Sequence, residues 1–231
     1  MGKFEKKYYP GGLLVPSELK KSQVFTAAKN FEAPNELILT GYCVPADDQG
    51  DKPWCAAYAA ANYAENLLWR KRGYHTEIAP APLYEYAKKI DGSPTTDGTY
   101  LECTLRALVK YGHFDSTVCK IKTIGGGFFN NADSALMDVK YAIHRYGVCM
   151  AGFNITDEWY TPDRGVIRGK LNNPVGGHAV LIVGYDEDGV LIQNSWGKRY
   201  GRNGIVYLTN NAFKDQFIYA AFLTRALDGL N

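Results

Sequence analysis

One segment in the second half of the chain limits the choice of fold more than any other. The run HAVLIVGY, residues 178–185, is apolar at nearly every position. A strand that does not alternate polar and apolar residues is buried on both faces and needs cover on both sides. The segment VLIQNSW, residues 190–196, follows across a short polar turn, so the two segments predict a β-hairpin.

The rest of the pattern predicts a helical first half and a β-rich second half. The run CAAYAAANYAENLLWRKR is rich in strong helix formers, and Gly73 follows its basic last turn as a stop. A later segment carries apolar residues at helical spacing and ends at Gly147. The expected helices cover residues 55–72, 82–90 and 101–111 and a stretch ending at 146. The expected strands cover residues 148–155, 178–185, 190–196, 204–209 and 217–224.

Composition and charge exclude several classes of function. The 231 residues are 46% apolar and carry a net charge of +2 with mixed signs, which is no footprint for nucleic acid or an anionic membrane. No apolar run approaches the roughly 20 residues that span a bilayer. No CxxC pair or tight Cys/His cluster suggests zinc. We therefore expect a monomer that needs no metal or other cofactor and binds neither nucleic acid nor a membrane.

The five cysteines are widely spaced and odd in number, which favours a reduced chain over a disulfide framework. Two bridges among Cys43, Cys103, Cys119 and Cys149 remain an open alternative. Cys55 is set apart because it follows Pro53 at the start of the predicted first helix. A helix N-terminus favours a thiolate, which is the nucleophilic form of cysteine.

A cysteine nucleophile needs an acid/base partner and a group that orients the partner. Of the four histidines, only His178 follows a Gly-Gly pair and opens a buried strand. Asn194 lies on the next strand of the hairpin, where its amide can hold the imidazole in one tautomer. Taken singly, Cys55 suits a packed helix and Asn194 suits a strand end. The three together predict a Cys-His-Asn triad.

The segments DQGDKPWCAAYA, GGHAVLIVGYD and NSWGKRYGRNG, in this order, resemble the papain-like cysteine proteases. The resemblance covers most of the chain, roughly residues 43–223. It implies an α+β papain-like fold, with a helical left lobe, a β-barrel-like right lobe and the active-site cleft between them. It also implies a divergent member, of bacterial or viral type.

The resemblance assigns roles to individual residues. Cys55 is expected to be the nucleophile, His178 its general acid/base and Asn194 the residue that orients His178. Gln49, six residues before Cys55, is in the position of the oxyanion-hole glutamine. Gly98 and Thr99 are expected to pair with the substrate backbone. The other expected substrate-binding residues are Gly177, Trp54 and Trp196. Trp196 is also expected to shield the His178–Asn194 hydrogen bond.

The chain departs from the family pattern just before the nucleophile. Lys52 replaces the first cysteine of the family's Cys-Gly-Ser-Cys-Trp motif, and Thr96 stands in the region of that cysteine's disulfide partner. Pro53 and Trp54 replace small residues, and Ala56 replaces an aromatic residue. The family disulfide is therefore expected to be absent and the neighbouring subsites to have an unusual shape.

The hairpin register is in conflict with the triad. A four-residue turn pairs Tyr185 with Val190 and hence His178 with Gly197, which places His178 and Asn194 on opposite faces. A β-bulge or a different turn length is needed to bring them together, and we expect an irregularity near residues 193–197.

We expect an N-terminal extension over residues 1–40 and a peptidase domain over residues 41–231. The extension fits a propeptide remnant, an arm that crosses the cleft, or a strand added to the β lobe. The helical lobe is expected over about 46–127 and the β lobe over about 128–225. The expected function is hydrolysis of peptide bonds in a protein or peptide substrate through a thioester on Cys55. The alternatives are an acyl transferase or peptide ligase with the same triad and a non-catalytic binding module. No signal peptide is evident, so a cytoplasmic location or a non-classical route is favoured over a lysosomal one.

Overall fold

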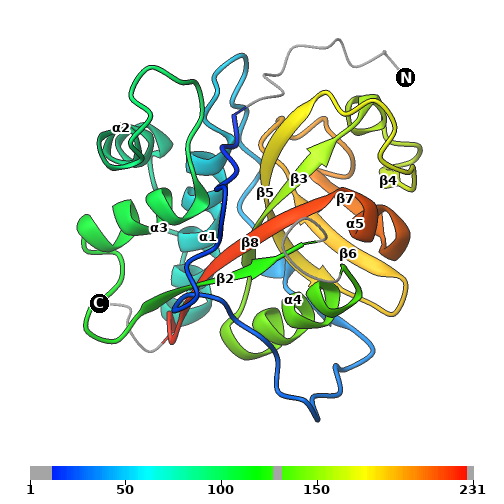
Figure 1. Ribbon diagram of the computed structural model, residues 1–231, viewed down its shortest axis with the longest axis horizontal. Coiled ribbons are helices and arrows are strands. Elements are labelled where there is room, and N and C mark those ends of the chain that lie inside the picture. The colour runs from blue at the N-terminus through cyan, green and yellow to red at the C-terminus, as the bar shows by residue number, and fades with distance from the viewer. Residues whose placement is uncertain (1–11, 127–131, 228–231) are drawn as a thin grey trace.

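The computed structural model describes residues 12–126 and 132–227. Three helices form one lobe and lie to the left in Figure 1: α1 (Cys55–Arg72), α2 (Pro80–Ile90) and α3 (Leu101–Lys110). The first part of α1 is rich in alanine and is buried except at Tyr58, because small side chains allow α2, α3 and β5 to approach it closely. Gly73 ends α1 in a left-handed conformation, with φ of 79°.

The second lobe is an open sheet in the order β2-β8-β3-β5-β6-β7-β4, and the short strand β1 pairs with β5 off this path. Helices α4 (Ala132–Tyr146) and α5 (Asn210–Gln216) pack against the sheet. The strands are β1 (Leu37–Ile38), β2 (Lys120–Gly125), β3 (Cys149–Ile155), β4 (Val166–Ile167), β5 (Gly176–Tyr185), β6 (Gly189–Gln193), β7 (Ile205–Thr209) and β8 (Phe217–Thr224). Two short 3-10 helices, Thr40–Tyr42 and Asp157–Tyr160, complete the regular elements described.

Strand β5 is the central strand that the apolar run predicts. It pairs with β3 on one side and with β6 on the other, and every residue from His178 to Tyr185 is buried. The bounds of α1 and β8 agree with the sequence prediction, whereas β2 and α5 were not predicted. The predicted lobe boundary at residues 127 and 128 lies outside the described residues. Strand β2 pairs with β8 along its full length, so the β lobe already includes Lys120.

The predicted bulge exists, but the position predicted for it was wrong. Tyr185 pairs with Val190 as expected, and the register shifts between Ile182 and Gly184, within β5. The backbone oxygen of Val183 accepts a hydrogen bond from the Leu39 amide at 2.8 Å. The bulge therefore forms where a β5 carbonyl accepts its hydrogen bond from Leu39, just after β1, instead of from β6. Leu39 is far from Val183 in the sequence.

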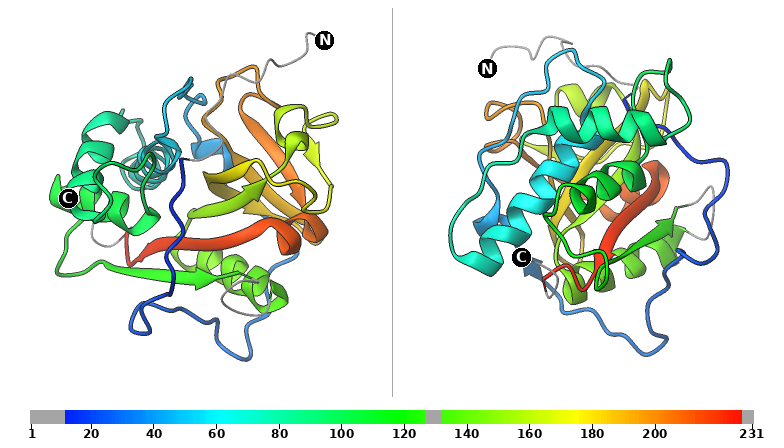
Figure 2. Two further views of the ribbon diagram at one scale, coloured as in Figure 1. Left: turned by 45° about the horizontal axis from the view of Figure 1, so that its top comes forward. Right: turned by 90° about the vertical axis from the view of Figure 1, so that its left-hand side faces the viewer.

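Residues 12–31, which we call the arm, run from one lobe to the other. Figure 1 shows the arm in dark blue between the helices and the sheet, and Figure 2 shows the same course from two other sides. Its far end is anchored at Phe25, whose amide donates to the Thr123 oxygen at 2.8 Å and whose ring packs on Tyr141, Tyr146 and Phe222. No helix in the described residues has the length and hydropathy needed to cross a membrane.

Candidate active site

Cys55 is the first residue of α1, directly after Trp54. The amide groups of the first helical turn have no partners within the helix, so they stabilise negative charge at this end. The thiol also receives a hydrogen bond from the backbone of Ala179, which follows His178 on β5. Cys55 thus lies where the helical lobe meets the central strand.

His178 and Asn194 are brought together as the sequence predicts. The imidazole Nε2 lies 2.8 Å from Asn194 Oδ1. With the register shift, Leu181 pairs with Gln193, and continuing this register places Asn194 on the same face as His178. The second ring nitrogen of His178, Nδ1, is buried without a hydrogen-bond partner. It is therefore the nitrogen left to exchange a proton.

Aromatic rings enclose the imidazole. Trp196 stacks on His178 with ring centroids 4.7 Å apart, and Trp159 meets it edge to face at 6.3 Å. Trp196 is itself only 1% exposed, because Tyr160 stacks on its other face and Tyr200 packs against it. Trp196 therefore shields the hydrogen bond of His178, as expected, but its burial does not suit it to be an open substrate-binding surface.

Burial favours the uncharged forms of Cys55 and His178. Cys55 and His178 are both 0% exposed. Burial raises the pKa of Cys55 to about 12, against smaller opposing effects of backbone hydrogen bonds. Burial likewise lowers the pKa of His178 to about 4, against the smaller opposing effect of the Asn194 hydrogen bond. A thiol and a neutral imidazole are the stable forms at neutral pH, rather than the thiolate that the helix start alone predicts.

Gln49 lies beside the triad and has both ends of its amide fixed. Its Nε2 donates to the Lys52 oxygen at 2.9 Å, and its Oε1 accepts from the Ser195 hydroxyl at 2.6 Å. The Gln49 backbone also donates to the Ser195 oxygen. Sequence reasoning missed Ser195, although its place directly after Asn194 was a signal that it lies at the site. One N–H of the Gln49 side chain is left over for an oxyanion.

The arm passes through the site as an extra strand. Leu13 forms a parallel bridge with Thr99, in which the Thr99 amide donates to the Gly12 oxygen at 3.3 Å and the Leu14 amide donates to the Thr99 oxygen at 3.1 Å. On the other side, the Leu13 amide donates to the Gly177 oxygen at 3.3 Å. The edges that the sequence assigns to substrate are therefore occupied by the arm.

The side chain of Leu13 fills a site that only small neighbours leave open. It is 5% exposed, and a methyl group added to Gly152 would collide with its Cδ2 atom. One residue before Leu13, a Cβ atom added to Gly12 would lie 2.9 Å from Cys55 Sγ. Glycine at position 12 therefore lets the arm backbone lie against the Cys55 thiol and helps to cover it.

The residues that replace the family motif form a stack. Lys52 lies over the Trp54 ring at 4.4 Å, and Trp54 stacks on Tyr84 with ring centroids 5.1 Å apart. The Tyr84 hydroxyl accepts a hydrogen bond from the Gly98 amide at 3.2 Å. None of the five cysteines, which all lie in the described residues, forms a disulfide. Aromatic and polar contacts thus connect the nucleophile's helix with the Gly98–Thr99 edge.

Comparison with known proteins places this chain in a family. A family model described as papain family cysteine protease matches residues 79–221, a range that includes His178 and Asn194 but not Cys55. Cathepsin B-like cysteine proteinase 3 of Caenorhabditis elegans is 30% identical over 96 residues, which cover 40% of this chain and 24% of that protein. Papain of Carica papaya is 24% identical over 192 residues, covering 75% of this chain and 54% of papain.

Solved structures share the fold. Xylellain, a cysteine protease from Xylella fastidiosa, superposes with a TM-score of 0.69 at 17% identity, covering 95% of this chain and 98% of that one. Digestive procathepsin L 3 of Tenebrio molitor gives a TM-score of 0.69 at 17% identity, over 90% of this chain and 75% of that one. The fold is thus α+β and papain-like. Since the family model matches more than half of its residues, the chain belongs to the papain family of cysteine proteases.

Proposed function

We propose that this protein is a cysteine peptidase that hydrolyses peptide bonds through a thioester on Cys55. The observation that supports it best is the hydrogen bond of 2.8 Å between His178 Nε2 and Asn194 Oδ1, which leaves Nδ1 without a hydrogen-bond partner. The residue after His178, Ala179, donates its backbone N–H to the Cys55 thiol, so the imidazole and the thiol are neighbours. The chain spans about a quarter to just over half of the length of the two relatives described above, so the activity of the whole protein is part of the proposal.

In the proposed reaction, His178 Nδ1 takes the thiol proton and Cys55 Sγ attacks the substrate carbonyl carbon. The C–N bond then breaks, and the proton on His178 passes to the departing amine, which leaves a thioester. Water attacks the thioester with His178 as the base, and the carboxylic acid leaves while the thiol is restored. The free N–H of Gln49 and the Cys55 amide stabilise the oxyanion, at about 3 kcal/mol per donor.

We further propose that the arm holds the enzyme in a latent form. Among the described arm residues, Gly12 lies against Cys55, and its carbonyl oxygen accepts from the Thr99 amide. This oxygen is therefore held on the Thr99 side and not by the Gln49 amide, so the Gly12 carbonyl is not set up for attack by Cys55. The described part of the arm, from Gly12 onward, thus occupies the site without presenting the Gly12 carbonyl for cleavage.

The pocket of Leu13 also suggests a substrate class. A substrate that replaces the arm meets the same small neighbours, Gly152 and Gly177, around the same apolar space. A branched aliphatic side chain fills that space without the desolvation cost of a polar one. We propose peptides with leucine or a similar residue at this position as substrates.

The test uses the full chain and the variant Leu13→Asp, which places a charge in the apolar pocket and should expel the arm. We expect Leu13→Asp to hydrolyse leucine-containing peptides at least tenfold faster than the unaltered chain. Val15→Asp is the matched control, because Val15 lies two residues away and is 40% exposed. Cys55→Ala in the Leu13→Asp background should abolish hydrolysis, and activity that survives this change would disprove the nucleophile.

Product analysis separates hydrolysis from acyl transfer. With an added amine nucleophile, a peptidase gives free carboxylic acids as the main product. A dominant amide product would instead identify an acyl transferase. Equal hydrolysis by the unaltered chain and Leu13→Asp would contradict the latency proposal while leaving the peptidase proposal intact.

A further inference from the structure

The loop between α2 and α3 carries the backbone edge that pairs with the arm. Its residues 91–99, which we call the edge loop, end at Gly98 and Thr99. The side chains in its middle, from Pro94 to Asp97, are exposed, so no apolar core holds the loop in place. Something else has to fix the direction of the Thr99 backbone groups.

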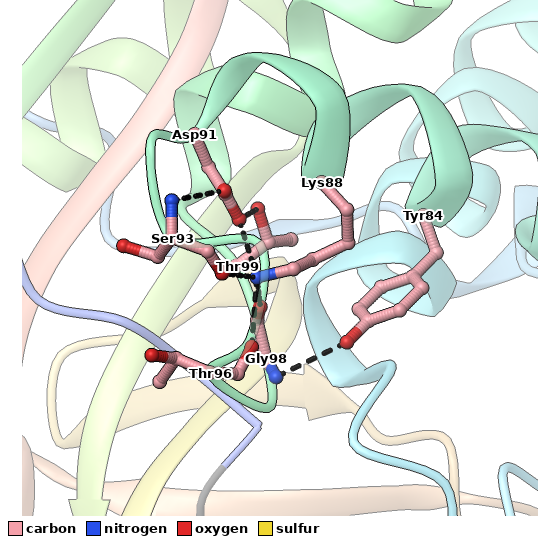
Figure 3. A network of polar contacts seen from close by, with 7 residues as sticks. All are labelled: Tyr84, Lys88, Asp91, Ser93, Thr96, Gly98 and Thr99. Carbon is pink, nitrogen blue, oxygen red and sulfur yellow. Dashed lines mark hydrogen bonds and ion pairs between the residues drawn. The ribbon is translucent and has the colours of Figure 1, made fainter.

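The ammonium group of Lys88 lies within this loop and binds four of its oxygen atoms. Lys88 Nζ donates to Asp91 Oδ2 at 2.8 Å and to the backbone oxygens of Ser93, Thr96 and Gly98 at 2.5, 2.7 and 3.0 Å. Figure 3 shows the side chain reaching from α2 into the centre of the loop. The Lys88 side chain is 15% exposed and that of Asp91 is 0% exposed, so this ion pair is shielded from solvent.

Asp91 extends the same network to the end of the loop. Its Oδ1 accepts from the Ser93 amide at 2.8 Å, and its Oδ2 accepts from the Thr99 hydroxyl at 3.0 Å as well as from Lys88. The carboxylate thus joins the first and the last residue of the edge loop. Its pKa is lowered by the hydrogen bonds from Lys88, Ser93 and Thr99, which outweigh the opposite effect of burial.

The bond from Lys88 to the Gly98 oxygen aims the next amide. In a planar trans peptide unit, the C=O of one residue and the N–H of the next point in opposite directions. Lys88 holds the Gly98 oxygen on the α2 side, so the Thr99 N–H points the other way, to the Gly12 oxygen at 3.3 Å. The Tyr84 hydroxyl holds the other side of the same residue by accepting from the Gly98 amide.

We propose that Lys88 is a positioning residue for peptide binding: it fixes the edge loop so that the Thr99 amide and carbonyl face a bound peptide backbone. This role rests on the proposed peptidase function, because the substrate is taken to replace the arm at the same edge. The family pattern implies a disulfide in this region. Here the Lys88 ammonium group and the loop oxygens that it contacts hold the same region in place. The contact involves Lys88 alone and not its neighbour Lys89, whose side chain is exposed.

The test measures how fast Cys55 of the full chain is labelled by two reagents, a leucine-containing peptidyl vinyl sulfone and iodoacetamide. Both reagents need an open site, so the opening of the arm cancels in the ratio of their rate constants. Losing the alignment of two backbone hydrogen bonds, worth about 1 kcal/mol each, should lower this ratio by about tenfold or more in Lys88→Met. Lys89→Met, which removes the same charge from the same helix, should leave the ratio unchanged.

A second probe separates positioning from general loss of stability. In this probe an ester replaces the amide that donates to the Thr99 oxygen. The ester should label the unaltered chain several-fold more slowly than the amide probe, but the two should label Lys88→Met at similar rates, since the edge is already misaligned. If the ester labels both chains more slowly than the amide probe by the same factor, the proposal is overturned. If Lys88→Met does not fold, Lys88→Arg is compared in the same way, because a forked guanidinium cannot place one nitrogen among four oxygens.

The outcomes distinguish this proposal from the function on which it rests. An unaltered chain that reacts with the peptidyl probe no faster than with iodoacetamide contradicts the peptidase function and the positioning role together. A clear preference for the peptidyl probe that Lys88→Met retains contradicts the positioning role alone. A preference that Lys88→Met loses and Lys89→Met keeps supports both.

Discussion

At the scale of single residues, burial decides the charge of the site. Cys55 lies against the arm and His178 lies among aromatic rings, both without contact with solvent, and desolvation is the largest influence on the pKa of each. Water that enters when the arm leaves removes this penalty and allows the thiolate–imidazolium pair to form. The arm thus acts on the chemistry of the pair as well as on access to it.

The effect of the arm on protonation of the site can be followed at His178. With a pKa near 4, below the ordinary 6.5, the imidazole of the full chain stays neutral between pH 5 and 7. We expect the ring ¹⁵N shifts of His178 to remain constant over this range and to change only near pH 4. In Leu13→Asp, a thiolate partner should keep the ring protonated to above pH 7. Signals are assigned with His178→Ala, and identical titrations in the two chains would contradict the effect of the arm.

A second buried group, Glu65 on α1, should reduce stability at neutral pH. It is 2% exposed, its Oε1 accepts from the Ile78 amide at 2.7 Å, and its Oε2 has no partner. Burial raises its pKa to about 8, against the smaller opposing effect of the Ile78 hydrogen bond. Between pH 4.5 and 8 the folded chain keeps a proton that the unfolded chain has lost, so the free energy of unfolding falls as pH rises.

Glu65→Gln should remove this pH dependence. The amide keeps an acceptor for Ile78 and carries no charge to desolvate, so we expect the variant to be about 1–3 kcal/mol more stable than the unaltered chain at pH 8. At pH 4.5 the two should be nearly equal. Urea unfolding at both pH values measures the difference, with the exposed Glu77→Gln as the control, and a variant that is less stable at pH 8 would contradict the assignment.

Sequence reasoning found the residues with a local signature and missed those defined by distant partners. Cys55, His178 and Asn194 each stand beside a recognisable turn, helix start or strand end. Lys88 gave no such signal, because its role depends on three backbone carbonyls of a loop whose path cannot be read from composition. The burial of Cys55 was missed for the same reason, since Gly12, which helps to cover it, lies more than forty residues before it.

At the scale of elements, long periodic segments were predicted well and short ones were not. The first helix has the predicted bounds, because its residues and its Gly73 stop are all local signals. Strand β2, with the sequence KIKTIG, is too short and too charged to stand out, and it is defined by pairing with β8, which lies far away in the sequence. The position of the bulge escaped for a similar reason, because Leu39 determines it.

The arm is an element in its own right, and its anchor can be weakened without touching the site. Phe25 packs on three aromatic rings of α4 and β8, with centroid distances of 5.2 to 6.1 Å. Losing these contacts in Phe25→Ala should weaken docking of the arm by about 1–3 kcal/mol, which raises the labelling rate of Cys55 by iodoacetamide about tenfold or more.

The control for this prediction is Glu32→Ala, a change of an exposed residue a few positions further along the chain. Labelling is read at Cys55 by mass spectrometry of the digested protein, so the other four cysteines do not contribute. An unchanged rate in Phe25→Ala would show that the segment from Gly12 to Leu14 holds the arm by itself.

At the scale of the whole molecule, the arm joins the two lobes along the line where they meet. It pairs with Thr99 of the helical lobe, with Gly177 of β5 and with Thr123 of β2 in turn (Figure 2). The sequence left open whether the extension crosses the site, because its glycines and prolines fit an arm as well as a strand added to the β lobe. Only the folded contacts distinguish the two.

Because the arm is covalently tethered, its release is an event within one molecule. We expect the labelling rate constant of Cys55 in the full chain to be the same at 1 and 100 μM protein when the reagent is in excess. An arm supplied by a second copy would make labelling slower at the higher concentration. Measurement of the rate over this range therefore tests whether the closed site belongs to a single chain.

The shared edge at Thr99 has a consequence for how such an enzyme would select its substrates. A tethered segment competes at a fixed local concentration, on the order of millimolar for a short flexible connection. Scarce or weakly bound peptides are then ignored, whereas abundant or tightly bound segments displace the arm and are cut. The hydrogen bonds of Gly12 and Leu14 would thus set the substrate concentration above which proteolysis begins. Changes in two or three residues of the arm would raise or lower this concentration.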